Sequence, residues 1–174
     1  MRELLKARLR VAGVAAEAEQ VEKLAAFHEL LTGANARMNL TRVSADPAEA
    51  IDRNYLDSLA PLPHLSGAKT CVDVGSGAGF PGVPLSIFLP DTHFVLMDSL
   101  LKRVEFLRGV IEELSLNAEA VCLRAEEAGR GDMRERFDAA TARAVAPLNV
   151  LCELLLPLVR VGGKMCIRDR SCSR

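Results

Sequence analysis

Apolar positions in the first third of the chain recur at the interval of an α-helix. Two such stretches lie before residue 33 and are separated by Gly13, and Gly33 is the expected end of the second. The positions that carry this spacing are Leu5, Leu9, Ala12, Val21, Leu24, His28 and Leu31. The chain is therefore expected to open with a pair of helices.

A third helix is expected to begin at Asp46. Asp46 has the residue type of an N-cap, Pro47 would take the first helical position, and Glu49 follows three residues after the cap. This helix should run to about Ala60, before the proline-rich linker "PLPHLSG". We expect residues 1–62 to form a helical extension and residues 63–174 a core, within one compact unit.

From residue 70 the pattern changes to short apolar runs that alternate with helical stretches. The expected strands cover residues 70–74, 93–98, 119–124, 137–143 and 163–167, and the expected helices residues 84–88, 99–114 and 148–159. Alternating strands and helices predict an α/β fold with a parallel sheet and right-handed crossovers. Ligands of such sheets bind beyond the carboxyl ends of the strands.

Composition restricts the class of protein. The 174 residues, 49% of them hydrophobic, suffice for one core, and no apolar run reaches the roughly 18 to 20 residues of a membrane span, so a cytoplasmic protein is expected. A net charge of −1 leaves nucleic-acid contacts to a local patch. The five cysteines form no CxxC pair and the three histidines are scattered, so no disulfide framework and no metal site are expected.

The stretch "DVGSGAGFPGVPL" (73–85) follows the first expected strand and leads into a helix. It does not fit a Walker A loop, because the position after Gly82, counted from Gly77, is Val83 where a lysine is required. A dinucleotide fingerprint counted from Gly75 places Phe80 where a third glycine should pack. This mismatch makes NAD binding a weaker hypothesis but does not exclude it.

The remaining pattern is G-x-G-x-G at Gly75, Gly77 and Gly79, with Asp98 at the end of the second strand. Bare backbone there suits S-adenosylmethionine, whose methionine part must approach closely, and Asp98 can accept hydrogen bonds from both ribose hydroxyls. The alternative interpretation is a tight turn with Asp98 as the cap of the following helix.

Two further strand ends are expected to reach the same crevice. Ala125 and Glu126 follow the third strand, where an adenine ring would lie, and Arg143 ends the fourth strand. The structural alternatives are a helix cap for Glu126 and a surface ion pair for Arg143.

Two types of methylation are disfavoured because the motifs that they require are missing. The fourth strand is not followed by the Asn/Asp-Pro-Pro-aromatic run of amine methylation, and Cys152, within an expected helix, is a poor nucleophile for pyrimidine C5 methylation. No general base is evident, so the catalytic residue is left unassigned. Guanine N7 already carries a free lone pair and needs no base.

Five motifs resemble one family in their order and spacing: "NLT" (39–41), "LDS" (56–58), "DVGSGAGFPGVPL" (73–85), "DSLLKRVEFL" (98–107) and "ARAVAPL" (142–148). They are similar to the bacterial 16S rRNA guanine-N7 methyltransferases, small-subunit methyltransferase G, formerly glucose-inhibited division protein B. The resemblance implies a class I S-adenosylmethionine-dependent methyltransferase with an N-terminal helical extension. It also implies N7-methylguanine in 16S rRNA, free or in the 30S subunit, as the product, and a monomer. The implied cofactor contacts are Gly75, Phe80, Ala125, Glu126 and Arg143.

Residues that contact RNA are less distinct. Two basic sets are candidates for phosphate contacts: Lys102, Arg103 and Arg108 after the second strand, and Arg37, Arg42 and Arg53 in the extension.

The chain departs from the family pattern in three places. It reads "GANARMNLT" where the family has Trp-Asn-Lys before "NLT", and "RNYLDS" where the family has a histidine before "LDS". Five strands are expected where the family fold has seven, and the tail "RDRSCSR" is polar and basic, so a C-terminal truncation is expected, with the fifth strand as an exposed edge. An NAD-dependent oxidoreductase and a non-catalytic cofactor-binding remnant remain as alternatives.

Overall fold

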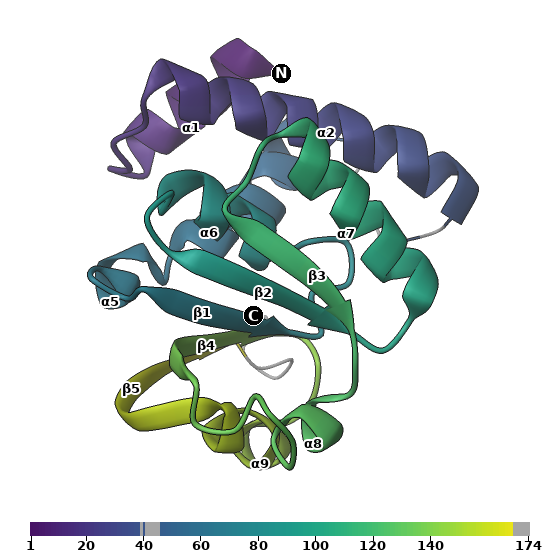
Figure 1. Ribbon diagram of the computed structural model, residues 1–174. Helices are drawn as coiled ribbons and strands as arrows, with labels where there is room; N and C mark the ends of the chain where they lie inside the picture. Colours follow the sequence, from purple (N-terminus) through teal and green to yellow (C-terminus); the bar gives the residue numbers. More distant parts are fainter. Residues whose placement is uncertain (39, 41–45, 169–174) are drawn as a thin grey trace.

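The computed structural model describes residues 1–38, 40 and 46–168 of the chain. Its centre is a parallel sheet of five strands in the order β3-β2-β1-β4-β5 (Figure 1). The strands are β1 (Thr70–Val74), β2 (His93–Asp98), β3 (Ala118–Cys122), β4 (Phe137–Arg143) and β5 (Val159–Arg168). In register, Val72 of β1 lies beside Val95 of β2 and Ala140 of β4. The predicted α/β fold with a parallel sheet is therefore confirmed.

The strand predictions differ from the structure at β3 and β5. β1, β2 and β4 have the predicted bounds, whereas β3 begins one residue earlier and ends at Cys122. β5 begins at Val159, four residues before the predicted start, because Val159 pairs with Phe137 ahead of an irregularity in the ladder. Gly162 and Gly163 lie at this irregularity. Because they interrupt the apolar run, the sequence pattern did not include the first part of the strand. β5 is an edge strand of the described sheet.

Helices cover both faces of the sheet (Figure 1). One face carries α1 (Arg2–Val11), α2 (Ala18–Met38), α6 (Gly82–Phe88) and α7 (Leu101–Glu113), and the other carries α8 (Ala125–Ala128) and α9 (Leu148–Leu155) with a 3₁₀ turn at Leu156–Leu158. Because side chains alternate along a strand, Cys71 belongs to the apolar cluster of the first face and Val72 to that of the second.

The N-terminal helices differ from the prediction at their ends. α2 does not end at Gly33 but continues to Met38, because Ala34 is still buried against the core. The predicted linker "PLPHLSG" contains a short helix, α5 (Leu62–Leu65), whose Leu65 is buried. Asp46 caps the third helix as predicted: its Oδ1 accepts a hydrogen bond from the N–H of Ala48 at 2.9 Å.

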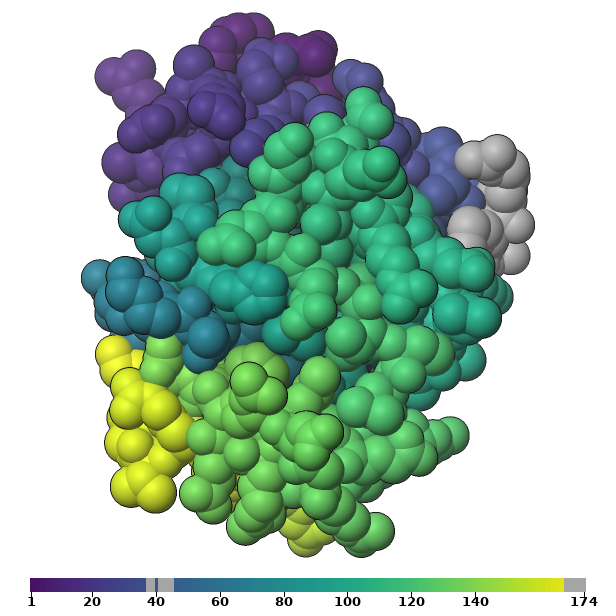
Figure 2. Space-filling model, in the orientation of Figure 1, coloured from purple at the N-terminus to yellow at the C-terminus, as the bar shows by residue number. Residues whose placement is uncertain are grey.

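The helix that begins at Pro47 changes its winding part-way. α3 (Pro47–Ala50) continues as a π-helical turn, η1 (Ile51–Leu56), and then as α4 (Asp57–Leu59). Tyr55 of this turn and Phe27 of α2 are buried in the same cluster as Leu107 of α7. Figure 2 shows the surface of α1 and α2 at one end of the molecule and that of β5 at the other. The division at residue 62 stays a prediction.

Within residues 1–38, 40 and 46–168, no helix has the length and apolarity that crossing a membrane would require.

Candidate functional site

A cavity of about 380 Å³ lies where the carboxyl ends of β1, β2 and β4 meet the loop after β3. Five of the six predicted cofactor residues line it: Gly75, Asp98, Ala125, Glu126 and Arg143. Arg103 and Val145 line it as well. Parallel strands end at the same edge of a sheet, so residues far apart in sequence meet there.

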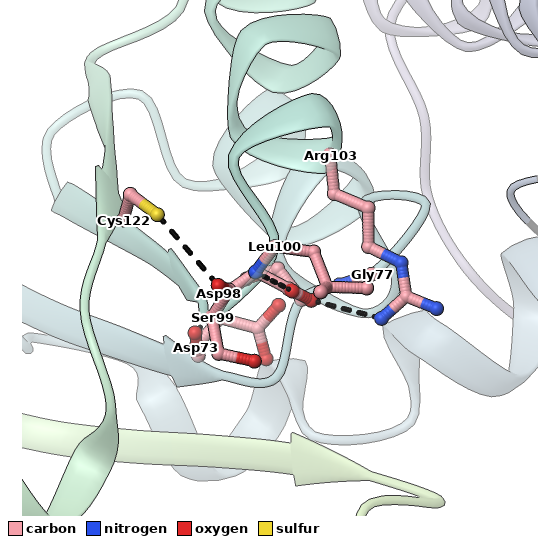
Figure 3. A network of polar contacts seen from close by, with 8 residues as sticks. Asp73, Gly77, Asp98, Ser99, Leu100, Arg103 and Cys122 are labelled. Carbon is pink, nitrogen blue, oxygen red and sulfur yellow. Dashed lines mark hydrogen bonds and ion pairs between the residues drawn. The ribbon is translucent and has the colours of Figure 1, made fainter. Parts of the chain in front are cut away.

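Asp98 is the polar centre of this cavity and is almost fully buried. Its Oδ2 accepts hydrogen bonds from the N–H of Gly77 at 2.9 Å and from Arg103 Nη1 at 3.3 Å, and its Oδ1 accepts one from the N–H of Leu100 at 2.9 Å (Figure 3). Leu100 is itself the N-cap of α7 and makes no side-chain cap bond, so Asp98 holds the residue before the helix and does not cap the helix. A carboxylate has roughly four acceptor positions, which leaves about one, and not two, for a further donor.

Gly75 is required by the close approach of the loop after β4. Its φ is +70°, and a Cβ placed on it would lie 2.6 Å from Cγ2 of Val145. Its N–H donates a hydrogen bond to the carbonyl of Met97 at 2.8 Å, which fastens the loop to β2. Val145 therefore packs directly on the bare backbone at the cavity wall.

Gly79, which was expected to offer bare backbone to a cofactor, faces the protein interior. A Cβ there would lie 2.8 Å from Val83 and 3.1 Å from Phe27. This glycine is needed because α2 and α6 pack against the loop, which a spacing of glycines cannot reveal.

Phe80 does not line the cavity. Its ring is 5% exposed and lies edge-on to Tyr55, with 5.4 Å between centroids. The guanidinium of Arg143 lies over the same ring, 5.0 Å from its centroid. The structure therefore places Phe80 behind Arg143, and its predicted contact with the cofactor stays a prediction.

Arg143 joins the end of β4 to the N-terminal helices. Its Nη1 donates hydrogen bonds to the carbonyl of Arg53 at 2.9 Å and to Oδ2 of Asp57 at 3.2 Å. Burial lowers the pKa of Arg143, and the charge of Asp73 opposes this shift. Arg143 is therefore a largely buried partner of the "LDS" motif and not a surface ion pair.

Asp73 is a site residue that the sequence analysis did not single out for a role. It is fully buried at the end of β1, where Thr141 donates to its Oδ1 at 2.9 Å and the N–H of Gly82 to its Oδ2 at 3.1 Å. Burial raises the pKa of Asp73 to about 6, and the two hydrogen bonds oppose this. The sequence did carry a signal for this role, because Asp73 is an acidic residue inside an otherwise apolar strand.

Ala125 and Glu126 begin the short helix α8 at the far wall of the cavity. Ala125 is buried and Glu126 is exposed in the first turn, where an acid is favourable to the helix. Both residues line the cavity.

The predicted RNA-binding residues do not share one environment. Lys102 is exposed at the start of α7, whereas Arg103 turns inward to Asp98. Arg108 donates to the carbonyl of Ala120 at 3.1 Å, and Arg53 pairs with Glu49 at 2.9 Å. The side chain of Arg37, all of Arg42, and Asn39 and Thr41 of the "NLT" motif lie outside the described residues.

Comparison with known proteins matches residues 20–168 to the GidB family, described as rRNA small subunit methyltransferase G. The chain is 46% identical over 148 residues to "Ribosomal RNA small subunit methyltransferase G" of Alkaliphilus metalliredigens, covering 83% of this chain and 62% of that protein. The protein of the same name from Levilactobacillus brevis is 41% identical over 169 residues, which cover 93% of this chain and 69% of that protein. The chain thus spans about 62% of the length of the first of these relatives.

Solved structures resemble the fold at low sequence identity. A protein described as a putative protein-L-isoaspartate O-methyltransferase from Plasmodium falciparum, in complex with S-adenosyl-L-homocysteine, has a TM-score of 0.62 at 19% identity, covering 97% of this chain and 84% of that one. An O-methyltransferase from Bacillus cereus has a TM-score of 0.58 at 20% identity, covering 92% of this chain and 71% of that one. The predicted class I methyltransferase fold is confirmed, and the chain belongs to the rRNA small subunit methyltransferase G family.

Proposed function

We propose that this protein transfers a methyl group from S-adenosylmethionine to N7 of a guanine in 16S rRNA. The observation that carries the proposal is the cavity in which the bare backbone of Gly75 meets the carboxylate of Asp98. Membership of the family supports the substrate.

The described residues fit the cofactor. The volume of about 380 Å³ lies within the range of small-molecule sites, about 300 to 1,000 Å³. Gly75 and Val145 line one wall of the cavity, Asp98 has an acceptor position left for a ribose hydroxyl, and Ala125 and Glu126 stand where an adenine would lie. When bound, S-adenosylmethionine supplies a methyl group activated by a sulfonium.

The protein's contribution to the reaction is alignment. Guanine N7 has a free lone pair, so no side chain has to remove a proton from the substrate. In agreement with this, no described histidine lines the cavity, and its titratable groups are Asp98, Glu126 and three arginines. Holding two reactants in line supplies on the order of 7 to 11 kcal/mol of the barrier.

The proposed partner is 16S rRNA, free or in the 30S subunit, which places the proposed activity in the bacterial cytoplasm. The deep, narrow major groove of an A-form helix hides N7, so the guanine has to be presented by a loop or by a partly assembled particle. Lys102, exposed at the start of α7 beside the cavity, is the proposed phosphate contact. We propose that the protein acts as a monomer.

Two measurements test the proposal. Calorimetry should show binding of S-adenosylhomocysteine and none of NADH, and the reverse result would favour an oxidoreductase. Tritiated methyl groups should then pass from the cofactor to 30S particles from a strain that lacks this methylation. Binding of S-adenosylhomocysteine without transfer to 30S particles or to free 16S rRNA would leave only a cofactor-binding remnant.

A further inference from the structure

Arg143 is a wall shared by two cavities. It lines the 380 Å³ cavity beside Asp98, and it also lines a second cavity of about 700 Å³ between the end of the N-terminal helices and β5. Asp57 and Pro81 also line the second cavity. Arg143 therefore contributes to the lining of both cavities.

The partners of this guanidinium come from outside the strand that carries it. Asp57 and the Arg53 carbonyl hold Nη1 from the N-terminal helices, and the Phe80 ring lies beneath it from the glycine loop. The ion pair is largely buried, with side chains 18% exposed for Arg143 and 12% for Asp57. Breaking a buried pair leaves a charge without compensation, which is far more costly than breaking a surface pair.

The π-helical turn presents both acceptors. In η1 the N–H of Asp57 bonds to the carbonyl of Asp52, five residues earlier, and the wider winding ends at Asp57. π-Helical turns occur frequently at functional sites. Tyr55 of the same turn packs edge-on against Phe80, so one turn of helix contacts both the guanidinium and the ring beneath it.

Other acids also lie in the surroundings of Arg143. Asp73, fully buried beneath the glycine loop, attracts Arg143, and Asp98 lies across the cavity with Arg103 as its partner. Without Asp57, the acids that remain around Arg143 are the buried Asp73 and, on the cavity wall, Asp98 and Glu126.

We propose that Asp57 is a positioning residue: it sets the guanidinium of Arg143 at the wall of the cofactor cavity, so the helical turn Ile51–Leu56 and Asp57 are part of the cofactor site. This inference rests on the proposed function. It assigns the "LDS" motif a role in cofactor binding, exerted through Arg143.

The test compares two matched variants of the full chain. Asp57→Asn removes the charge that holds Arg143. Asp138→Asn removes a comparable acid of β4, 17% exposed and paired with Arg160 near the opposite end of the strand. Calorimetry with S-adenosylhomocysteine and thermal unfolding are measured for both variants.

We expect Asp57→Asn to weaken binding of S-adenosylhomocysteine about tenfold, or about 1.4 kcal/mol. Asp138→Asn should lower the melting temperature to a similar degree and leave the dissociation constant unchanged. In an Arg143→Gln background, Asp57→Asn should cause no further loss of affinity, because its effect passes through Arg143.

Each other outcome has a definite meaning. Equal dissociation constants for Asp57→Asn and the unsubstituted chain, or full additivity with Arg143→Gln, would overturn the positioning role and leave the proposed function intact. If the unsubstituted chain failed to bind S-adenosylhomocysteine, both would be overturned. If Asp57→Asn did not fold, the comparison would use Arg143→Lys, which keeps the charge; unchanged affinity there would also overturn the inference.

Discussion

The backbone N–H of Gly77 donates a hydrogen bond to Oδ2 of Asp98 over 2.9 Å, so the loop after β1 is fastened to the last residue of β2 (Figure 3). Asp98 therefore has two tasks: it holds the glycine loop in place, and it is the proposed acceptor for a ribose hydroxyl.

Asp98→Asn should weaken binding of S-adenosylhomocysteine by about 10- to 100-fold. Hydrogen bonds to a charged group contribute about 1.5 to 3 kcal/mol, and an amide offers one acceptor oxygen and no charge. Calorimetry measures the change, with Glu105→Gln, which alters an exposed acid of the following helix α7, as control. Equal affinity for Asp98→Asn and the control would remove Asp98 from the cofactor site.

Gly75→Ala should destabilise the protein and reduce cofactor binding, because the added Cβ meets both a positive φ and Val145. Gly67→Ala is the matched control: Gly67 has a φ of +82° and no atom within 4 Å of the added Cβ. The control carries only the backbone cost of about 1 to 2 kcal/mol. Urea unfolding and calorimetry should therefore show a larger loss of stability for Gly75→Ala, and weaker binding in that variant alone. Equal losses of stability and of cofactor affinity in both variants would mean that Val145 moves aside and that its contact with the added Cβ has no effect.

The contribution of Asp73 to stability should fall as the pH rises from about 4 to about 6. Burial raises the pKa of Asp73 from 3.8 to about 6, so in this window the folded protein keeps a proton that the unfolded chain has released. The free energy of unfolding therefore decreases with pH by up to roughly 3 kcal/mol and levels off above the folded pKa.

Urea unfolding of the unsubstituted chain and of Asp73→Asn at several pH values isolates this contribution, because an amide does not titrate. The difference in free energy between the two should shrink or reverse as the pH rises through the window. A difference that stays constant with pH would show that Asp73 does not titrate there.

Lys102→Glu and Arg103→Glu should have different effects. Lys102 is exposed, so its reversal should weaken binding of 16S rRNA and spare S-adenosylhomocysteine. Arg103 pairs with Asp98 at 3.3 Å at the cavity wall, so its reversal should weaken both. Filter binding for RNA and calorimetry for the cofactor separate the two; loss of cofactor affinity in Lys102→Glu would contradict this division.

Much of the candidate site followed from the order of motifs. The glycine loop, Asp98 and Arg143 were each expected at a strand end, and parallel strands bring such ends together whatever the details of packing. The inward turn of Arg103 was not predictable, because exposed and inward-facing positions alternate within one turn of a helix and the pattern of α7 identifies only its apolar face.

The roles of individual glycines and of Phe80 required the structure. Gly75 and Gly79 look alike in the sequence, yet one meets Val145 at the cavity and the other meets Val83 and Phe27 in the core. The ring of Phe80 lies beneath the guanidinium of Arg143, and its predicted contact with the cofactor stays a prediction. In each case the neighbour comes from a distant segment, so no local pattern records it.

The sequence by itself determined the α/β alternation, the parallel sheet and the edge at which the site lies, because periodicity and the alternation of strands and helices are readable along the chain. Only the tertiary structure decided which side chains hold one another at that edge. Asp57 and Arg143 are 86 residues apart in the chain, and their pairing depends on how the π-helical turn packs against the glycine loop. Such contacts depend on how whole helices and strands pack against one another. The spacing of residues within one element carries no information about that packing.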